Sequence, residues 1–396
     1  MNDLANPDGH GYEPNATAAD GASTLAELAL EIVPTTQPSP EGFFTLGKRG
    51  HRWVLLTPSR APFFSAGLNH IDSSPLRYPE NLERWDQRYG NDMVRWIRES
   101  VAPNLKSWGF NSVGWVQEVS IMKHAHTPSF TLEEYRALDM PYCHLLPFIE
   151  THQWNPWHRN PDLFSQDFED WCDYVARDQC ARLKDEANLI GYFYSDCPTW
   201  VHTRPENEWR GPMFDPDRLE SDAGRRELFD LAERYYRVTH DAIRRYDPHH
   251  LILGDRYEAN APLPLEIVKA AKPYVDVLSF QDFNRPVEHL AAWHDNTGKP
   301  VLMADGAGLC IQVDDSTGRY RCGCYSMVDG VWYDKVVQGL LDSPGAIGAH
   351  LCGAYIRNRF RGRGLIDEAE QPDTTAIAQL RKTHEAVADW LRDFGT

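Results

Sequence analysis

The feature that most constrains the fold is a regular alternation of short apolar runs with amphipathic helical segments. Such an alternation is typical of strands that pair in parallel and are joined by helices. The predicted strands cover residues 63–70, 110–117, 142–149, 189–195, 251–256, 275–281, 300–305 and 346–354. Eight strands of this kind over about 330 residues favour a single (β/α)8 TIM barrel, an α/β fold, over an open sheet.

The connecting segments support this interpretation. Phe168, Cys172 and Val175 recur at helical spacing in the stretch that precedes residue 189. The segment from Asp92 to Gly109 is also predicted to be helical, and its glycine is suited to end the helix. No GxGxxG motif follows the first strand, which removes support for a dinucleotide-binding fold.

The N-terminal region divides into a tail and a hairpin. Residues 1–37 are rich in Pro, Ala, Asn, Asp and Thr and predict a partly disordered or draped N-terminal tail, in which TLAELALEIV (24–33) is compatible with one helix. Residues 38–396 are predicted to form the barrel domain. Its first segment has two β-rich arms around Lys48-Arg49-Gly50, which predicts a hairpin that closes one end of the core.

The composition of the chain limits the classes of partner that we expect it to bind. The net charge of −18 argues against nucleic acid and anionic membranes. No apolar run reaches the length of a membrane span, and the N-terminus lacks the pattern of a signal peptide. The eight cysteines are scattered, and Cys322-Gly323-Cys324 has a spacing that is poor for zinc. We therefore expect a cytoplasmic protein with reduced cysteines, without a metal or other cofactor; the sequence leaves a homo-oligomer open.

Every predicted strand ends in polar residues, and the active site of a (β/α)8 barrel lies at these carboxyl ends. The candidate substrate-binding residues there are Asn69, His70, Gln117, Glu118, Trp154, Ser195, Trp200, Arg256, Tyr257, Gln281, Asp282, His350 and Arg357. Several also have a purely structural interpretation. Asp282 is placed to cap the following turn, His70 and His350 are typical of core histidines, and Glu118 is able to form a salt bridge with Arg256 or Lys123.

Two carboxylates are the strongest catalytic candidates. Asp196 ends the apolar run LIGYFYSD, and Asp305 ends VLMAD. The fourth and seventh strands face each other across an eight-stranded barrel, so these side chains are expected to enter one cleft from opposite sides. Glycoside hydrolysis requires such a pair, with one acid for the leaving oxygen and one base or nucleophile.

Several segments resemble the β-agarases of glycoside hydrolase family 50 and related retaining barrels of clan A. The resemblance lies in GFFTLGKRGHRWVLLTPSRAPFFSAGLN, PDLFSQDFEDWC, AIRRYDPHHLILGDR and GAIGAHLCGAYIRN followed by GRGLIDE, in this order along the chain. It implies a sugar-active barrel in which Asp196 and Asp305 occupy the positions of the acid/base and the nucleophile. The family has Glu at both positions, and Ser195 stands where the family has an Asn that binds the sugar 2-hydroxyl.

The two shorter side chains have a geometric consequence. Replacing Glu by Asp retracts a carboxylate by about 1.5 Å. Two such changes on opposed strands widen the gap from about 5–5.5 Å, as in retaining enzymes, into the range of about 6.5–9.5 Å found in inverting ones. We therefore expect hydrolysis with inversion of an oligosaccharide or small glycoside, exo-type, with Asp196 as acid and Asp305 as base.

Other interpretations remain open at this point. A lyase or isomerase would use the same carboxylates as proton carriers, and a sugar-binding barrel would not use them catalytically. A metal-dependent hydrolase would draw on His124 and His126 or on His249 and His250. The arginines in RNRFRGRG, together with Arg256, are able to bind an anionic substituent of a sugar, although this loop also reads as a solvated segment.

Overall fold

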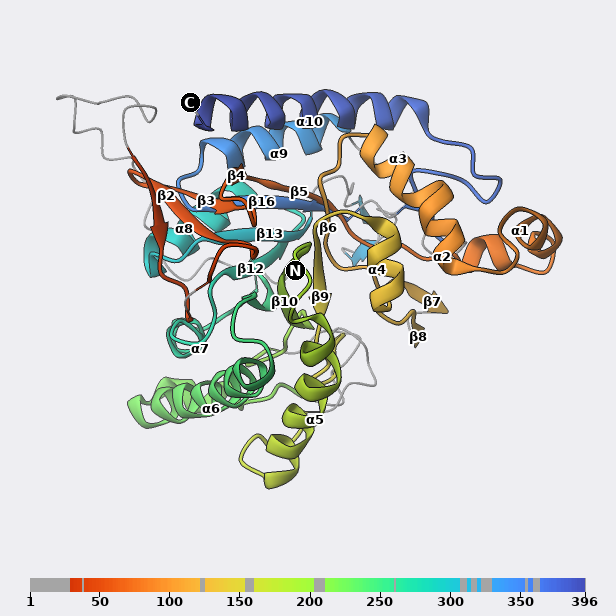
Figure 1. Ribbon diagram of the computed structural model, residues 1–396. Coiled ribbons are helices and arrows are strands. Elements are labelled where there is room, and N and C mark those ends of the chain that lie inside the picture. The colour runs from red at the N-terminus through yellow and green to blue at the C-terminus, as the bar shows by residue number, and fades with distance from the viewer. Residues whose placement is uncertain are drawn as a thin grey trace.

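The computed structural model describes the chain in segments. These comprise residues 29–37, 39–121, 125–153, 160–202, 211–259, 261–306, 312–314, 319–321, 330–352, 355–358 and 364–395. The chain is drawn from red at the N-terminus to blue at the C-terminus in Figure 1.

Eight parallel strands close into a barrel, and every predicted strand contributes one of them. In chain order these are β5 (Ser65–Leu68), β6 (Ser112–Val113), β9 (Tyr142–Leu145), β10 (Leu189–Asp196), β11 (Leu251–Glu258), β12 (Leu278–Asp282), β13 (Val301–Gly306) and β16 (Ala346–Leu351). Each strand pairs with its neighbour in this order, and β16 pairs with β5 to close the ring. The predicted (β/α)8 barrel is confirmed.

Helices occupy the connections between these strands and cover the outside of the barrel (Figure 1). They are α1 (Leu82–Tyr89), α2 (Met93–Trp96), α3 (Ala102–Ser107), α4 (Leu132–Leu138), α5 (Gln166–Leu183), α6 (Asp222–Tyr246), α7 (Leu265–Ala271), α8 (Pro286–Thr297), α9 (Gly330–Asp342) and α10 (Thr374–Gly395). A π-helical segment, Ile97–Val101, joins α2 to α3. Pro103 follows it and lacks the N–H that a regular helix would need there. Gly109 has a φ of 83° just after the helix, as its predicted role requires.

An antiparallel sheet precedes the barrel. Its strands are β1 (Leu30–Val33), β2 (Thr45–Arg49), β3 (Arg52–Leu56) and β4 (Pro62–Phe63), in that order. The predicted hairpin is confirmed, with Gly50 in the left-handed conformation of its turn. The helix expected over residues 24–33 is wrong where the chain is described, because Leu30–Val33 pairs with β2. Ile32 and Val33 are β-branched, and the free edge of β2 offers them a partner. Two small hairpins, β7 (Val119–Ile121) with β8 (Ala125–His126) and β14 (Gln312–Asp314) with β15 (Arg319–Arg321), complete the described strands.

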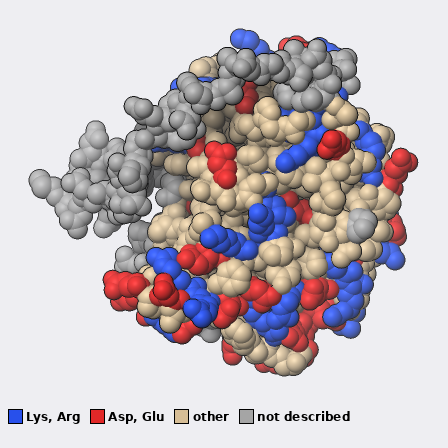
Figure 2. All heavy atoms as spheres, turned by 90° about the vertical axis from the view of Figure 1, so that its left-hand side faces the viewer, with Lys and Arg blue, Asp and Glu red and all other residues tan. Residues whose placement is uncertain are grey.

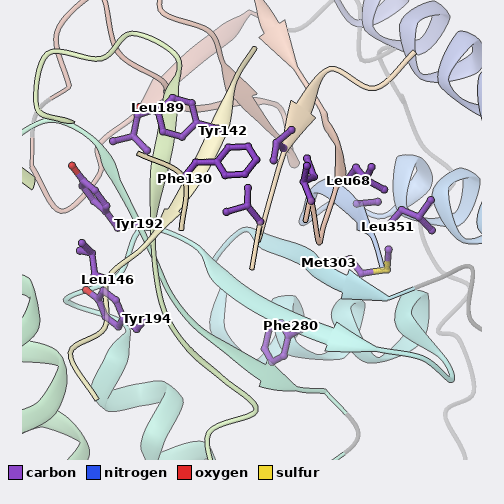
Figure 3. Packing of buried hydrophobic residues seen from close by; sticks show 14 of the residues in the cluster. Leu68, Phe130, Tyr142, Leu146, Leu189, Tyr192, Tyr194, Phe280, Met303 and Leu351 are labelled. Carbon is purple, nitrogen blue, oxygen red and sulfur yellow. The ribbon is translucent and has the colours of Figure 1, made fainter. Parts of the chain in front are cut away.

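The apolar residues form two layers. The outer layer lies between the strands and the helices, and Figure 3 shows part of it around Leu68, Tyr142, Tyr192, Phe280 and Met303. The inner layer fills the barrel and continues into the N-terminal hairpin. It comprises Phe44, Leu46, Trp53, Leu55, Phe63, Trp115, Cys143, Leu145, Ile190, Phe193, Leu251, Leu253, Val277, Leu302, Ala304 and Ile347. The hairpin therefore closes the end of the barrel where the strands begin, which leaves the opposite end for polar residues.

Charged side chains of both signs are interspersed over the face in Figure 2, which is the left-hand side of Figure 1. Among the described residues, no helix is long and apolar enough to cross a membrane.

Candidate active site

Asp196, Arg256 and Asp305 meet at the carboxyl end of the barrel. The guanidinium of Arg256, from β11, is completely buried. Its Nη2 lies 2.8 Å from Asp196 Oδ1 of β10, and its Nη1 lies 3.7 Å from Asp305 Oδ2 of β13. The cation also rests over the ring of Trp115, 3.9 Å from the ring centroid. One buried cation thus contacts both of the predicted catalytic carboxylates.

Irregular strand pairing aims these side chains inward. The register between β10 and β11 shifts before Asp196 pairs with Arg256, and the register between β12 and β13 shifts before Asp305. Gly254 precedes this end of β11 with a φ of 66°, a conformation that suits a residue without a side chain. Bulges of this kind re-aim side chains beside active sites, because one extra residue reverses the in-and-out alternation.

Asp305 is held as a carboxylate. Asn69 Nδ2 donates a hydrogen bond to its Oδ1 over 2.8 Å and another to the carbonyl of Ala304. The carbonyl of the Asn69 side chain accepts from the backbone N–H of Trp115, which fixes the orientation of the amide. Burial alone would raise the pKa of Asp305, but the charge of Arg256 and the neighbouring His70 and Asn69 hold it well below its usual range.

Asp196 is anchored from two further directions. Gln281 Nε2, from β12, donates to Asp196 Oδ1 over 2.8 Å. The backbone N–H of Asp196 donates to the carbonyl of Thr151 over 2.5 Å. Because Asp196 and Asp305 contact the same guanidinium, their nearest oxygens are separated by at most roughly 9 Å, the sum of the two contacts and the width of that planar group. This bound allows both retaining and inverting geometry.

His70 begins a second cluster beside Asp305. It has a φ of 64°, and its Nδ1 donates to the carbonyl of Gln117 over 2.6 Å. Its Nε2 lies 3.7 Å from Asp305 Oδ2. Burial would lower the pKa of His70, but Cys352, Glu118 and Asp305 together raise it to about 10.

Glu118 and Arg357 complete the cluster. Both are buried, and Arg357 Nη1 lies 3.3 Å from Glu118 Oε2. Arg357 Nη2 also donates to the carbonyl of Cys352 over 2.8 Å. The structure thus brings together seven of the candidate binding and catalytic residues, Asn69, His70, Glu118, Asp196, Arg256, Gln281 and Asp305, with Arg357 beside them.

Three candidates lie on the outside of the barrel instead. The hydroxyl of Ser195 donates to Asp255 Oδ1 over 2.6 Å, and Trp200 packs on Tyr235 of α6. Tyr257 bonds to the hydroxyl of Tyr236. The shift in β10 that turns Asp196 inward leaves Ser195 facing the helices. Sequence alternation alone does not reveal such a shift, so these expectations find no support in the geometry.

Asp282, Gln117 and Trp154 are not part of the cluster around Arg256 either. Asp282 accepts from the backbone of Asn284 and Arg285 and contacts His289, so it caps the turn that precedes α8. The side chain of Gln117 reaches Ser129 at 3.5 Å. Trp154 lies outside the described residues.

His350 lies inside the barrel. Its Nε2 is 2.8 Å from the hydroxyl of Ser65, and burial lowers its pKa to about 3. It packs beneath Asn69, against Gly67 and Gly114, where an added Cβ would collide with its ring. It therefore supports the floor of the site as a neutral core histidine.

Two contacting residues were not among the sequence candidates. Trp115 carries the Arg256 cation, and Cys352 lies next to His70. Trp115 lies near the carboxyl end of the predicted strand 110–117. An aromatic residue in an apolar strand is usually interpreted as part of the core. Cys352 follows β16 directly. Its position at the end of a predicted strand is the sequence feature that could have identified it as a site residue.

Of the two histidine pairs considered for a metal, the structure describes the side chains of His249 and His250, and these lie away from Asp305. His250 bonds to Asp247 and to the carbonyl of Glu186, at the end of the barrel opposite Asp305, and His249 contacts Phe43 there. His124 and the side chain of His126 lie outside what the structure describes.

Comparison with known proteins supports the fold. No protein-family model matches the chain, and no curated protein matches its sequence. Among solved structures, the agarase AgWH50C aligns with a TM-score of 0.67 at 18% identity, over 94% of this chain and 67% of that one. An exo-beta-agarase aligns with a TM-score of 0.66 at 16% identity, over 94% and 69%. An endo-1,4-beta-mannanase from Rhizomucor miehei aligns at 0.51 and 14% identity, over 85% and 98%.

The chain therefore has a (β/α)8 barrel that is similar in fold to these agarases. At these identities the likeness extends to the fold, and the activity has to be argued from the residues of this chain.

Proposed function

We propose that this protein is a glycoside hydrolase whose catalytic carboxylates are Asp196 and Asp305. The observation that carries the proposal is their convergence on Arg256 at the carboxyl end of the barrel. Active sites of this fold lie at that end. Two carboxylates within roughly 9 Å of each other are the minimum that glycoside hydrolysis requires.

Asp305 is the base. A base must be ionised at working pH, and the depressed pKa of Asp305 meets that condition. Asn69 holds Oδ1, so Oδ2 is the oxygen directed toward a water or toward the anomeric carbon. We propose that Oδ2 takes a proton from the attacking water, which gives inversion of configuration.

Asp196 is the acid in this scheme. The proton must then reside on Asp196 while the substrate is bound and pass to the leaving oxygen. The ion pair with Arg256 at 2.8 Å opposes this protonated state. The scheme therefore requires Arg256 to turn toward Asp305 or toward the sugar when substrate enters.

The substrate is proposed to be an oligosaccharide or small glycoside, cleaved from its end. The neighbouring exo-beta-agarase supports the exo mode by analogy of fold. A cleft of about 800 Å³ is lined by Glu150, Thr151 and Trp171, and it adjoins the backbone of Asp196 through the carbonyl of Thr151. Asn69, His70, Glu118, Gln281 and Arg357 are the groups within the pocket that are able to bind sugar hydroxyls or an anionic substituent.

The test is product analysis on a panel of aryl glycosides and oligosaccharides, including agaro-oligosaccharides. Mass spectrometry should show addition of one water, and proton NMR should show the inverted anomer first. A retained anomer would overturn the base role of Asp305, and a product without added water would indicate a lyase or isomerase.

A second candidate is a sugar-binding barrel without hydrolysis. The direct ion pair between Arg256 and Asp196 favours this alternative, because the pair occupies the carboxylate that would have to act as the acid. In that case Asp196→Asn and Asp305→Asn would retain sugar binding by calorimetry, and the wild type would release no product from any ligand that it binds.

A further inference from the structure

Three potential metal ligands converge at the edge of the pocket. One ligand atom each of His70, Asp305 and Cys352 lies within 4.8 Å of the others. The three residues follow or end β5, β13 and β16, which are consecutive in the barrel. Their exposed fractions are 7%, 4% and 2%, so the cluster lies in the protein interior and is not a group of acidic residues on the surface.

His70 presents an unused nitrogen to this cluster. Its Nδ1–H is committed to the carbonyl of Gln117 at 2.6 Å, which directs Nε2 toward Asp305 and Cys352. Within the described part of the chain, Nε2 is buried and makes no hydrogen bond. Metal-bound histidines characteristically donate their second N–H to a carbonyl or carboxylate in this way. A buried polar atom without a partner is costly, which makes its presence here significant.

Asp305 is oriented in the same manner. Its Oδ1 accepts from Asn69, and its Oδ2 faces His70 Nε2 at 3.7 Å. That distance is too long for a hydrogen bond. It matches the spacing of roughly 3.3–3.8 Å between two ligand atoms that share a tetrahedral ion with bonds of about 2.0–2.3 Å.

We propose that His70 Nε2, Asp305 Oδ2 and Cys352 Sγ bind one divalent ion of zinc type. A thiolate, an imidazole and a carboxylate suit Zn²⁺ or Co²⁺ rather than Mg²⁺ or Ca²⁺. Three protein ligands leave one position for water. The site extends beyond the proposed hydrolysis and competes with it, because Oδ2 cannot bind a metal and act as the base at the same time.

Charged neighbours surround the cluster. The carboxylate of Glu118 acts on His70, whereas Arg256 lies 3.7 Å from Asp305 Oδ2 and Arg357 lies 3.7 Å from Cys352 Sγ. Binding of M²⁺ requires Cys352 as the thiolate and a free lone pair on His70 Nε2, so any proton on either ligand leaves to solvent and metal binding weakens as the pH falls.

The test is titration of the full-length, chelator-treated protein with Co²⁺, followed by absorption spectroscopy. We expect one ion per chain, a thiolate-to-cobalt charge-transfer band in the near ultraviolet and displacement by Zn²⁺. Cys352→Ser should abolish the band and weaken binding by more than about 100-fold. His70→Asn should weaken binding similarly, and Asn tolerates the positive φ at this position.

Cys172→Ser is the matched control, since this buried cysteine lies on α5 away from the cluster. It should leave the cobalt spectrum unchanged, and circular dichroism should show that each variant is folded. A folded wild type that binds no cobalt at micromolar concentration, or a band that persists in Cys352→Ser, would overturn the site. The spectrum reports binding directly, so the result stands whether or not hydrolysis is found.

Discussion

The two ends of the barrel both bury charged groups, but they satisfy them in different ways. At the end where the strands begin, Asp276 accepts hydrogen bonds from the backbone of Ile252 at 2.7 Å and of Thr36 at 2.6 Å. Arg244 adds a third at 3.1 Å. Both oxygens of Asp276 are therefore engaged, and the hairpin seals this end from water.

At the other end, Arg256 and His70 lie 3.7 Å from Asp305 Oδ2, and Oδ1 is anchored by a short hydrogen bond from Asn69. The buried Nε2 of His70 makes no hydrogen bond within the described residues. A saturated carboxylate serves the fold, whereas a carboxylate with one directed oxygen is prepared for a ligand. This contrast, more than burial or charge alone, distinguishes the proposed functional end from the structural end.

The largest expected effect is the loss of hydrolysis in Asp305→Asn. The amide keeps the size of the side chain but cannot accept a proton, so kcat/KM should fall about 10³-fold on any glycoside that the wild type cleaves. Steady-state kinetics provide the measurement. Asp276→Asn is the control from the sealed end and should keep the specific activity of the folded fraction. Equal losses in both variants would mean that the two ends do not differ in role.

The largest stability effect should come from Asp276→Ala. It leaves Arg244 buried without its carboxylate partner and two backbone N–H groups without an acceptor, at a cost of about 4 kcal/mol in the free energy of unfolding. Urea denaturation at neutral pH provides the measurement. Glu99→Ala removes an exposed ion pair with Arg95 and should cost less than about 1 kcal/mol. A cost for Asp276→Ala as small as this would contradict the sealed-end interpretation.

The sequence predicted the architecture better than the site. Strand number, parallel order and the closing hairpin follow from apolar periodicity and turn residues, which act locally. Asp196 and Asp305 were also found this way, because each ends an apolar run. The alternation rule then failed at Ser195 and Tyr257, where register shifts between neighbouring strands decide which side chains face inward. Those shifts depend on pairing across the barrel, and a single strand does not encode them.

The bridging position of Arg256 was likewise invisible to sequence. Asp255 and Arg256 are adjacent in the sequence. In the structure they point to opposite sides of β11: Asp255 bonds to the hydroxyls of Tyr235 and Tyr236, and Arg256 bonds across the pocket. Adjacent residues on a strand alternate between faces. The irregular conformation at Gly254 therefore determines that Asp255 faces the helices and that Arg256 faces the inside of the barrel.

An intermediate effect is expected from Arg256→Met at the open end. Methionine preserves the apolar contact with Trp115 but removes the cation from Asp196 and leaves Asp305 with His70 as its neighbour. The free energy of unfolding should fall by about 3 kcal/mol. Arg256→Lys should recover part of this loss, since it restores charge without the planar fork. If the lysine variant is no more stable than the methionine variant, charge compensation is not what Arg256 contributes.

The smallest expected effect concerns a buried histidine in the helical layer. His384 Nδ1 donates to the carbonyl of Trp108 at 2.8 Å, and Nε2 accepts from the hydroxyl of Tyr333 at 3.0 Å. Burial lowers its pKa to about 4, so the folded protein resists a proton that the unfolded chain accepts below about 6.5. The contribution of His384 to stability is therefore complete above pH 6.5 and is lost as the pH falls toward 4.

His384→Gln should remove this loss, because glutamine keeps one donor and one acceptor but does not titrate. Between pH 6.5 and 4.5, the wild type should lose more stability than the variant, by about 1 kcal/mol per pH unit. Denaturation curves of both proteins at the two pH values provide the comparison. Identical slopes would show that His384 takes up its proton as readily in the folded state as in the unfolded chain, so that burial does not lower its pKa.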